Sequence, residues 1–340
     1  MAGTKRGWCA AALLGLLAIA CWLSALSLAS WLTRQYDGLS VRYTQPAVTQ
    51  KDLLRVIGET PEGELHVRAA WTRDAGLQTA GFELGTQTQL RRIQAYGDMR
   101  AIAPMQLLSG AFPVEDDAEG CLIDAASAWT LFHSTDATGA KVMLDDREYI
   151  IRGVAEMYEP AMMIRSEQAA YENLEFAAQD PDGAKQSLET FLYRCGNADD
   201  YVIVQSGLAV RVVRGAVWLP LWIAAAGVMA ALVRQGWKAQ ERPARRAFFL
   251  AAGIVLGTLL CWGVVSNFYW PQSFLPTKWS DFSFWGKMID TWRTDAKACA
   301  LMTQLPKEIE LFSALRRCMV ALIVSILSGG WCVAKVGKVT

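Results

Sequence analysis

The chain has 340 residues with 33 basic and 33 acidic side chains, so its formal net charge at pH 7 is zero. A neutral chain has no overall electrostatic attraction to nucleic acid or other polyanions. Hydrophobic residues make up 53% of the sequence and charged residues 19%, which is more apolar than a typical soluble domain. The composition therefore indicates membrane segments.

Four uncharged apolar runs approach the length of a membrane span. They are residues 8–32, 215–233, 247–265 and 318–334. A membrane helix needs about 20 apolar residues to cross about 30 Å of hydrocarbon, and four such runs argue against buried helices of a soluble protein. The last run is the shortest, and Ala314 and Leu315 extend it. The first is too long for the apolar part of a cleaved signal peptide, so we expect an uncleaved anchor.

Basic residues near the spans predict the orientation of the chain. The short segment between the second and third runs carries Arg234, Lys238, Arg242, Arg245 and Arg246. The N-terminus adds Lys5 and Arg6, and the C-terminus adds Lys335 and Lys338. With four spans these three segments fall on one side, and positive charge favours the cytoplasmic side. We therefore expect both termini to be cytoplasmic.

This topology predicts seven segments along the chain. They are a cytoplasmic N-terminus with the first transmembrane helix (1–33), an extracytoplasmic domain (34–213), a second transmembrane helix (214–234), a cytoplasmic loop (235–246), a third transmembrane helix (247–267), an extracytoplasmic aromatic-rich loop (268–313), and a fourth transmembrane helix with a cytoplasmic C-terminus (314–340).

The extracytoplasmic domain is expected to mix helices and strands. Alternating apolar residues predict strands in 39–48 and 64–72, and a helix follows Thr49, which is a candidate N-cap. Residues 180–194 read as a loop that leads into a helix. The β-branched residues of 201–213 predict a strand that reaches the second span.

Residues 120–154 show the clearest local pattern. A short apolar strand, 121–123, precedes Asp124, whose carboxylate can cap a following helix. Gly139 suits a turn that requires positive φ. Two strands, 141–144 and 149–154, then flank the polar sequence Asp-Asp-Arg-Glu, which predicts a hairpin.

This stretch, together with residues 107–112 and the acidic spacer that follows them, resembles the periplasmic core domain of MacB-type ABC transporter permeases, a superfamily that includes FtsX-like and LolC/LolE-like subunits. The matching residues are Gly110, Phe112, Ala128, Leu131, Phe132, Gly139, Leu144, Tyr149, Gly153 and Val154. Ala111 stands where arginine is common in the family. The layout of one span, a large external domain and three further spans is also that of these permeases.

The resemblance implies an α+β fold, that is, four transmembrane helices with a mixed α/β extracytoplasmic domain of the MacB-like core type. It also implies a bacterial cytoplasmic membrane, a homo- or heterodimer with another permease, and a separate cytoplasmic ABC ATPase. The family transmits ATP-driven motion to the external domain, so the resemblance predicts no enzyme activity and no cofactor. The alternative is a membrane-anchored extracytoplasmic binding or scaffold protein, derived from such permeases, that works without an ATPase.

Two segments depart from the family pattern. The family places a coupling helix between the second and third spans, whereas 234–246 is short and basic and contains Pro243. This segment is either a positive anchor or a reduced ATPase-facing segment. In the external loop, Trp285, Met288, Ile289 and Trp292 share one helical face. They predict either a helix in the headgroup layer or packing against the external domain.

The sequence offers no catalytic, cofactor-binding or metal site. It lacks the glycine-lysine spacing of a Walker loop, and its two histidines, His66 and His133, are far apart. The acidic cluster Glu115, Asp116, Asp117 and Glu119 is interpreted as a solvated loop. Cys121 is assigned to a buried strand, so a disulfide with Cys195 is not expected, although the pairing stays open.

Overall fold

The structure is a computed structural model that describes residues 2–61, 65–82, 85–165, 169–178, 183–196, 200–239, 243–269, 271, 283–302 and 304–339. The chain divides into two compact units. The membrane unit comprises Met1–Asp37, Gly207–Leu275 and Glu310–Thr340. The ectodomain comprises Gly38–Ser206 and Pro276–Ile309. Both the mixed α/β fold and the four long helices expected from the sequence are confirmed.

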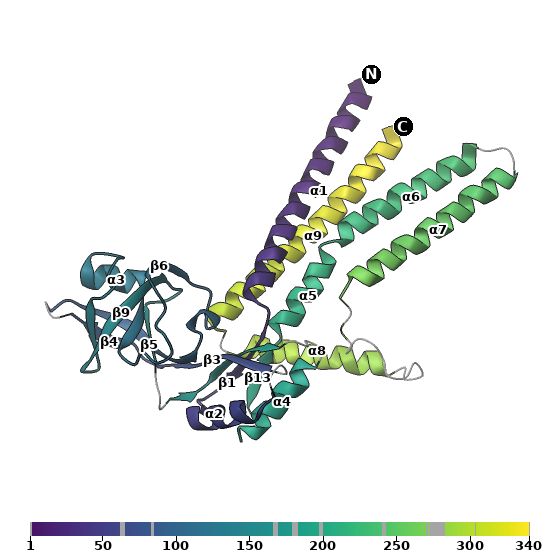
Figure 1. Cartoon of the computed structure of the whole chain (residues 1–340). Helices are drawn as coiled ribbons and strands as arrows, with labels where there is room; N and C mark the ends of the chain where they lie inside the picture. Colours follow the sequence, from purple (N-terminus) through teal and green to yellow (C-terminus); the bar gives the residue numbers. More distant parts are fainter. Residues whose placement is uncertain are drawn as a thin grey trace. The chain divides into compact units, whose positions relative to one another are not determined.

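The helices of the described residues are labelled in Figure 1 where space allows. They are α1 (Ala2–Gln35), α2 (Gln50–Glu59), the short 3₁₀ helix η1 (Met99–Ala101), α3 (Ala125–Phe132), α4 (Ala184–Arg194), α5 (Ser206–Ala216), α6 (Leu219–Ala239), α7 (Pro243–Asn267), α8 (Phe284–Leu301) and α9 (Pro306–Val339).

The strands all lie in the ectodomain. They are β1 (Leu39–Tyr43), β2 (Val48–Thr49), β3 (Leu65–Arg73), β4 (Gln78–Gly81), β5 (Gln87–Gly97), β6 (Gln106–Gly110), β7 (Gly120–Asp124), β8 (Lys141–Leu144), β9 (Arg147–Glu156), β10 (Ala161–Arg165), β11 (Ala170–Tyr171), β12 (Asn173–Ala178) and β13 (Tyr201–Val204).

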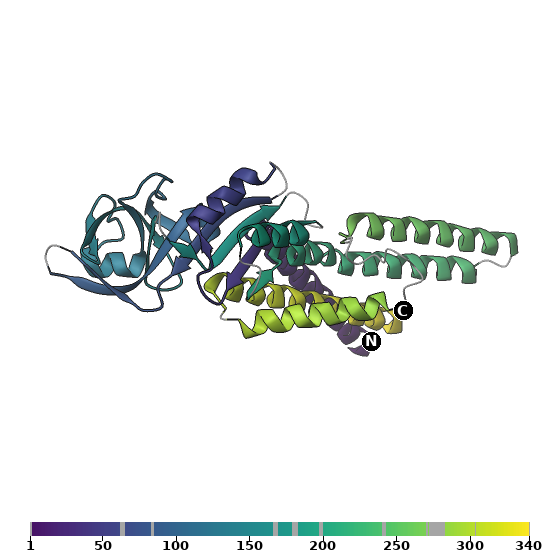
Figure 2. The same ribbon diagram turned by 90° about the horizontal axis from the view of Figure 1, so that it is seen from below.

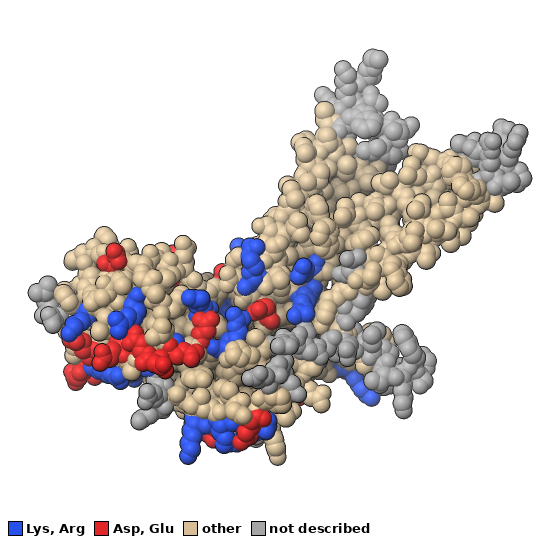
Figure 3. All heavy atoms as spheres, viewed as in Figure 1, with Lys and Arg blue, Asp and Glu red and all other residues tan. Residues whose placement is uncertain are grey.

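Four helical segments of the described residues are long and apolar enough to span a membrane. They are Cys9–Gln35, Ser206–Lys238, Ala247–Ser266 and Pro306–Val333. Most of their exposed side chains are apolar, as membrane lipid requires, and Figure 3 shows few charged residues along the long helices. By contrast, acidic and basic side chains are interspersed over the ectodomain surface (Figure 3).

Within the membrane unit, α1 and α9 contact each other through small polar groups. Ser325 donates to the carbonyl of Ala18 at 2.9 Å, and the thiols of Cys318 and Cys332 donate to carbonyls of α1 at 3.5 and 3.2 Å. Such side chain to backbone bonds are a common means of joining membrane helices. Ala25 and Ala29 of α1 pack with Cys318 in one apolar cluster.

The second span is broken into α5 and α6. Pro220 has no N–H to donate to Ala216, and this loss explains why the helix is interrupted at residues 217–218. The Trp22 indole of α1 donates to the Val217 carbonyl at 2.9 Å. The strand predicted for 201–213 is therefore wrong beyond Val204. Buried Val210, Val213 and Val217 recur at helical spacing, and this period overrides the strand preference of valine.

The ectodomain contains a closed ring of strands. In the described residues, β10, β7, β9, β8, β4 and β5 pair in that order, and β5 pairs back with β10. Figure 2 shows these strands curving into a rounded barrel beside α3. Ile123, Leu144 and Ile151 point into its apolar core, to which α3 contributes Ala128 and Leu131.

An open sheet continues from the ring. β5 also pairs with β3, and the sheet then runs through β12 and β1 to β13. One face packs against α2 and α4, which contribute Leu53, Val56 and Leu188 to a second core with Val41 and Phe176. The opposite face carries the polar side chains of alternate residues, and this face holds the site described below.

The local prediction for residues 120–154 is confirmed. Asp124 caps α3 by accepting from the amides of Ala126 and Ser127 at 2.9 and 3.1 Å, and Gly139 has φ 83°. The hairpin turn is shorter than expected. Only Asp145 and Asp146 lie between β8 and β9, both with positive φ, as a tight two-residue turn requires. Thr49 caps α2, also as predicted.

Candidate functional site

The most unusual feature of the ectodomain is a buried group of four charged side chains. β1 alternates, so Leu39, Val41 and Tyr43 enter the α2–α4 core while Ser40 and Arg42 point to the other face. β12 pairs with β1 so that Glu175 lies opposite Ser40. The hydroxyl of Ser40 donates to Glu175 Oε2 at 2.6 Å.

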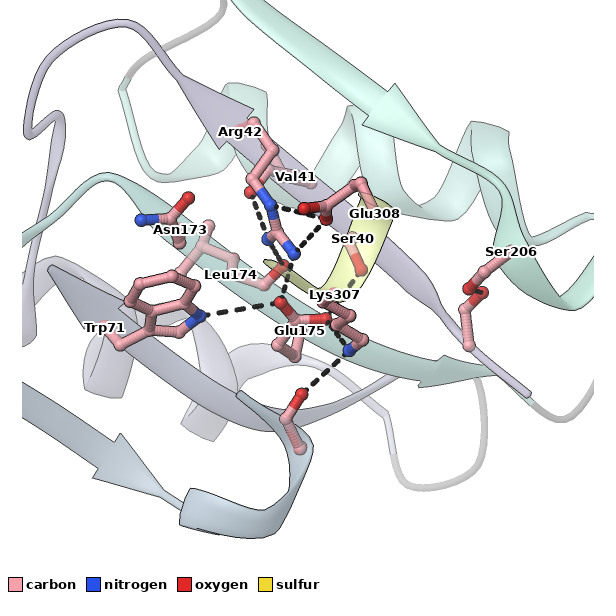
Figure 4. A network of polar contacts seen from close by, with 12 residues as sticks. Ser40, Val41, Arg42, Trp71, Asn173, Leu174, Glu175, Ser206, Lys307 and Glu308 are labelled. Carbon is pink, nitrogen blue, oxygen red and sulfur yellow. Dashed lines mark hydrogen bonds and ion pairs between the residues drawn. The ribbon is translucent and has the colours of Figure 1, made fainter. Parts of the chain in front are cut away.

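The first turn of α9 completes this network (Figure 4). Arg42 donates from Nη2 to Glu175 Oε1 at 2.5 Å and to Glu308 Oε1 at 2.6 Å. Lys307 donates to Glu175 Oε2 at 2.6 Å and to the carbonyl of Ala101, at the end of η1, at 2.7 Å. The Trp71 indole of β3 lies 3.5 Å from Glu175 Oε1. We call Arg42, Glu175, Lys307 and Glu308 the charge network.

The charge network is almost completely removed from solvent. The exposed fractions of its side chains are 5% for Arg42, 3% for Glu175, 2% for Glu308 and 14% for Lys307. Two cations face two carboxylates, so the buried charges cancel. Burial of an ion costs several kcal/mol, which is compensated only when pairing and hydrogen bonding are nearly complete.

The pKa values follow from this pairing. Burial alone would raise the pKa of Glu175, but the cations Arg42 and Lys307 and the hydrogen bonds of Lys307 and Ser40 outweigh it and lower the pKa. Burial alone would lower the pKa of Arg42, but the carboxylates of Glu175 and Glu308 outweigh it and raise the pKa. Arg42 and Glu175 are therefore both charged at neutral pH, and the ion pair between them is present.

The start of α9 is suited to this position. Pro306 occupies the first helical position, where its missing N–H costs no hydrogen bond, and the acidic Glu308 lies in the first turn, where the helix dipole stabilises a negative charge. One oxygen of Glu308, Oε2, is buried without a hydrogen-bond partner in the described structure. A buried acceptor without a partner is destabilising, so this end of the network is its weakest point.

An apolar anchor lies directly before the network. Leu305 is 5% exposed and packs in a third ectodomain cluster with Trp71, Ile102 and Met163. A cavity of about 40 Å³ remains next to it, which has room for little more than one water molecule. Residues 305–308 therefore fix the beginning of α9 to the open sheet by apolar packing and by charge.

The residues of the family motif lie in the ring and its flanks. Leu131, Tyr149 and Val154 are buried in the ring core, and Phe132 packs at its edge. Gly110 has φ 73°, and a Cβ there would meet the carbonyl oxygen of Arg152 at 2.1 Å. Gly153 also allows a close backbone approach, and Phe112 lies beneath the guanidinium of Arg100. These residues shape the fold.

The other predicted sets are only partly described. Arg234 and Lys238 are exposed in the last turns of α6, whereas Arg242 lies outside the described residues. The backbones of Arg245 and Arg246 belong to the first turn of α7, which begins at Pro243. α6 and α7 thus extend into the predicted loop and leave only residues 240–242 between them.

The aromatic stripe lies on α8 as predicted for a helix. Trp285, Ile289 and Trp292 are 48%, 44% and 43% exposed, and Met288 is half-buried. The helix also contacts the rest of the ectodomain, because Lys185 of α4 lies 3.4 Å from Asp295. This polar contact supports packing against the ectodomain, and the exposed apolar face supports a helix in the headgroup layer. Both alternatives therefore stay open.

The remaining candidate side chains have structural surroundings. Asp117 accepts from the Gly120 amide and pairs with Arg152 at 2.7 Å, a contact that lowers the pKa of its carboxyl. His133 ends α3 in the left-handed conformation. Cys121 and Cys195 are free thiols in different cores, and burial raises their pKa values to about 12 and about 11. No metal-binding group occurs among the described residues.

The charge network was not predicted from the sequence. The sequence gives only weak local signals for it. Arg42 and Glu175 are charged residues within mostly apolar strands, and Lys307 and Glu308 lie at the start of a candidate span. The partners are 133 and 266 positions apart from Arg42, and no local pattern connects such distant positions.

The chain combines four candidate spans with a mixed α/β domain, and three solved domains are similar to part of it. The periplasmic region of MacB from Actinobacillus actinomycetemcomitans matches with 13% identity and a TM-score of 0.44, over 52% of this chain and 92% of that one. The extracellular domain of YknZ, a noncanonic ABC-type transporter from Gram-positive bacteria, matches with 15% identity and a TM-score of 0.38, over 49% and 99%. A domain described as part of a permease from Porphyromonas gingivalis matches with 14% identity and a TM-score of 0.36, over 51% and 91%.

No protein-family model and no curated protein matches the chain. The chain itself has four candidate spans and a mixed α/β domain. At these identities and TM-scores the likeness concerns the fold alone and names no substrate or partner.

Proposed function

We propose that the chain is the transmembrane subunit of an ABC-type complex and passes ATP-driven motion from a separate cytoplasmic ATPase to its extracytoplasmic domain. The observation that carries this proposal is the start of α9. One uninterrupted helix, Pro306–Val339, contains a candidate span and begins inside the charge network of the ectodomain. A displacement of this helix along or about its axis would act directly on β1 and β12, because packed elements move as rigid bodies.

The charge network supports this role better than a purely stabilising one. Replacing a buried ion group by apolar side chains is often neutral or stabilising, so stability alone does not account for it. Ion pairs have strict geometry, and Arg42 contacts both Glu175 of the sheet and Glu308 of the helix. Such a pairing fixes one register between helix and sheet and transmits force in that register.

The experiment is a capture of the full-length chain from its own membranes in mild detergent. We expect a co-purifying subunit with a Walker loop and ATP hydrolysis that vanadate inhibits. Hydrogen exchange is then compared with and without vanadate trapping. Amides of residues 173–178 and 307–309 should change their protection, while those of β9 in the ring serve as the internal control. Recovery of the chain without any ATPase activity would contradict the proposal.

The alternative is a membrane-anchored extracytoplasmic binding or scaffold protein without ATPase coupling, and one observation favours it. The link between α6 and α7 has room for only residues 240–242, so no separate coupling helix fits there. In our proposal the basic ends of α6 and α7, with Arg234, Lys238, Arg245 and Arg246, take over this contact with the ATPase. Arg234→Glu with Lys238→Glu would then abolish ATPase co-purification and leave the ectodomain folded.

The orientation belongs to the same proposal, with both termini and the α6–α7 link in the cytoplasm of a bacterial cell. Cysteines are introduced at the exposed Thr130 and at Lys238, and intact cells are treated with a membrane-impermeant maleimide. We expect labelling at position 130 above the background of the native cysteines, and none at 238 until the cells are opened. Equal labelling of the two positions in intact cells would exclude this topology.

For α8, we propose that the exposed face of Trp285, Ile289 and Trp292 lies in the outer headgroup layer, where tryptophan is enriched. The full-length chain is reconstituted into vesicles whose phospholipids carry bromine near the headgroup. Wild-type tryptophan fluorescence should be quenched more than that of Trp285→Phe with Trp292→Phe. Equal quenching would instead favour α8 packing on the ectodomain surface.

A further inference from the structure

We propose that α5, the start of α6 and the end of α7 form a binding site for the phosphate group of an anionic phospholipid. The membrane unit has a cavity of about 660 Å³ at this point. It is lined by Arg211, Arg214, Gly215, Trp218, Leu221, Trp222, Ser266, Phe268 and Tyr269. The volume falls within the range of small-molecule sites.

Two guanidinium groups supply the charge of this site. Arg211 and Arg214 are three residues apart and therefore share one face of α5. Neither forms an ion pair with a carboxylate among the described residues. The guanidinium of Arg211 lies over the ring of Tyr269 at 5.6 Å, and the side chain of Arg214 is exposed. Guanidinium groups bind phosphate oxygens in bidentate fashion, so an anionic ligand fits the unmatched charge.

The remaining lining distinguishes a lipid from free phosphate. Trp218, Leu221 and Trp222 follow the arginines within the candidate span Ser206–Lys238, and each is at least partly exposed. These apolar surfaces suit a glycerol backbone and the upper part of acyl chains, which free phosphate lacks. Tryptophan and arginine side chains at a membrane–water boundary are typical contacts of headgroups.

The shape of the cavity depends on two local features. The break at residues 217–218 separates α5 from α6. Gly215 lets the end of α7 approach closely, because a Cβ at this position would meet the ring of Phe268 at 2.9 Å. The ring of Phe268 and the side chains of Arg211 and Arg214 therefore line the same cavity. The break between α5 and α6 thus shapes a binding cavity as well as connecting two helices.

The test uses the full-length chain in dodecyl maltoside, titrated with palmitoyl-oleoyl phosphatidylglycerol and followed by native mass spectrometry. Arg211→Gln with Arg214→Gln should weaken binding of the tightest lipid by about tenfold, which corresponds to about 1.4 kcal/mol. Arg234→Gln with Lys238→Gln removes the same charge at the other end of α6 and should leave that affinity within about twofold. Equal affinity in the first variant, or equal losses in both, would overturn the proposal.

Two further measurements identify the ligand and do not depend on the folding of a variant. Excess inorganic phosphate should not displace the bound lipid from the wild-type chain, and displacement would show a free-phosphate site instead. A phosphatidylglycerol with a photoreactive group near its glycerol should cross-link the wild-type chain within 211–222 or 266–269. Cross-links confined to other segments would contradict the site. Loss of ATPase co-purification would count against the proposed function only. The lipid-binding and cross-linking results expected for this site do not depend on it.

Discussion

The ring of strands and the open sheet of the ectodomain bury their faces with different chemistry. In the ring, Ile123, Leu144 and Ile151 are at most 1% exposed and pack in an apolar core. On the network face of the open sheet, Arg42 and Glu175 are also buried, with 5% and 3% of their side chains exposed, but carry charge. The ring is closed upon itself, whereas the open sheet receives the first turn of α9. Buried charged side chains thus take the place of an apolar core where the open sheet contacts the first turn of α9, the helix that contains a candidate span.

This comparison indicates separate tasks for the two regions. An apolar core tolerates small shifts, because dispersion and burial have little directionality. A buried ion pair loses much of its energy when its partners separate, since few alternative partners exist in the interior. The ring is accordingly a stable body, and the charge network is the geometrically strict joint. Each prediction below changes one side of this comparison.

The largest expected effect is on the joint. Arg42→Met leaves Glu175 and Glu308 buried beside each other with Lys307 as the sole nearby cation of the network. Removal of one partner of a buried ion group costs about 3–5 kcal/mol of the free energy of unfolding. Chemical unfolding of the full-length chain in detergent measures it. Arg194→Gln is the control, because its pair with Glu59 is 39% and 45% exposed and should matter by less than about 1 kcal/mol.

The next test replaces the whole network. One variant removes all four charges of the network together, with the substitutions Arg42→Met, Glu175→Leu, Lys307→Met and Glu308→Leu. We expect stability between unchanged and about 4 kcal/mol higher, while the change in hydrogen exchange on vanadate trapping at 173–178 is lost. A variant that is stable and still transmits this change would refute the role of the network as a joint.

A smaller effect is expected in the ring. Ile151→Val removes one methyl group from a fully buried position and should cost about 0.5–1.5 kcal/mol. Vanadate-dependent exchange at residues 307–309 should remain as in the wild type. A clear change in that exchange would mean that the ring also transmits motion. The ring and the open sheet would then not have separate tasks.

The smallest effect is a dependence on pH. The pKa of Glu175 is lowered in the folded chain from its usual 4.5. The carboxylate therefore contributes stability above about pH 4.5, and this contribution is lost as the pH falls from there through the lower folded-state value. The stability difference between the wild type and Glu175→Gln should be constant from pH 7 to about 5 and shrink in stronger acid. Glu59→Gln, which removes a surface carboxylate, should show no comparable trend.

Much of the ring could be predicted from the sequence because its signals are local. Asp124 caps amides two and three residues ahead, and Gly139 and the Asp145–Asp146 turn mark chain reversals by their own backbone preferences. The error in 201–213 has the opposite cause. Composition favoured a strand there, but burial of Val210, Val213 and Val217 along one face made a helix. Tertiary packing overrides intrinsic preference in such segments.

The sequence by itself determined the four spans, the alternation of the strands, the helix caps and the turns, because each depends on residues a few positions apart. Only the tertiary structure decided that β10 closes the ring on β5, that Arg42 and Glu175 meet Lys307 and Glu308, and that Arg211 and Arg214 share a cavity with Tyr269. These contacts join positions tens to hundreds of residues apart. Their energies depend on burial and geometry, which arise only when the whole chain has folded.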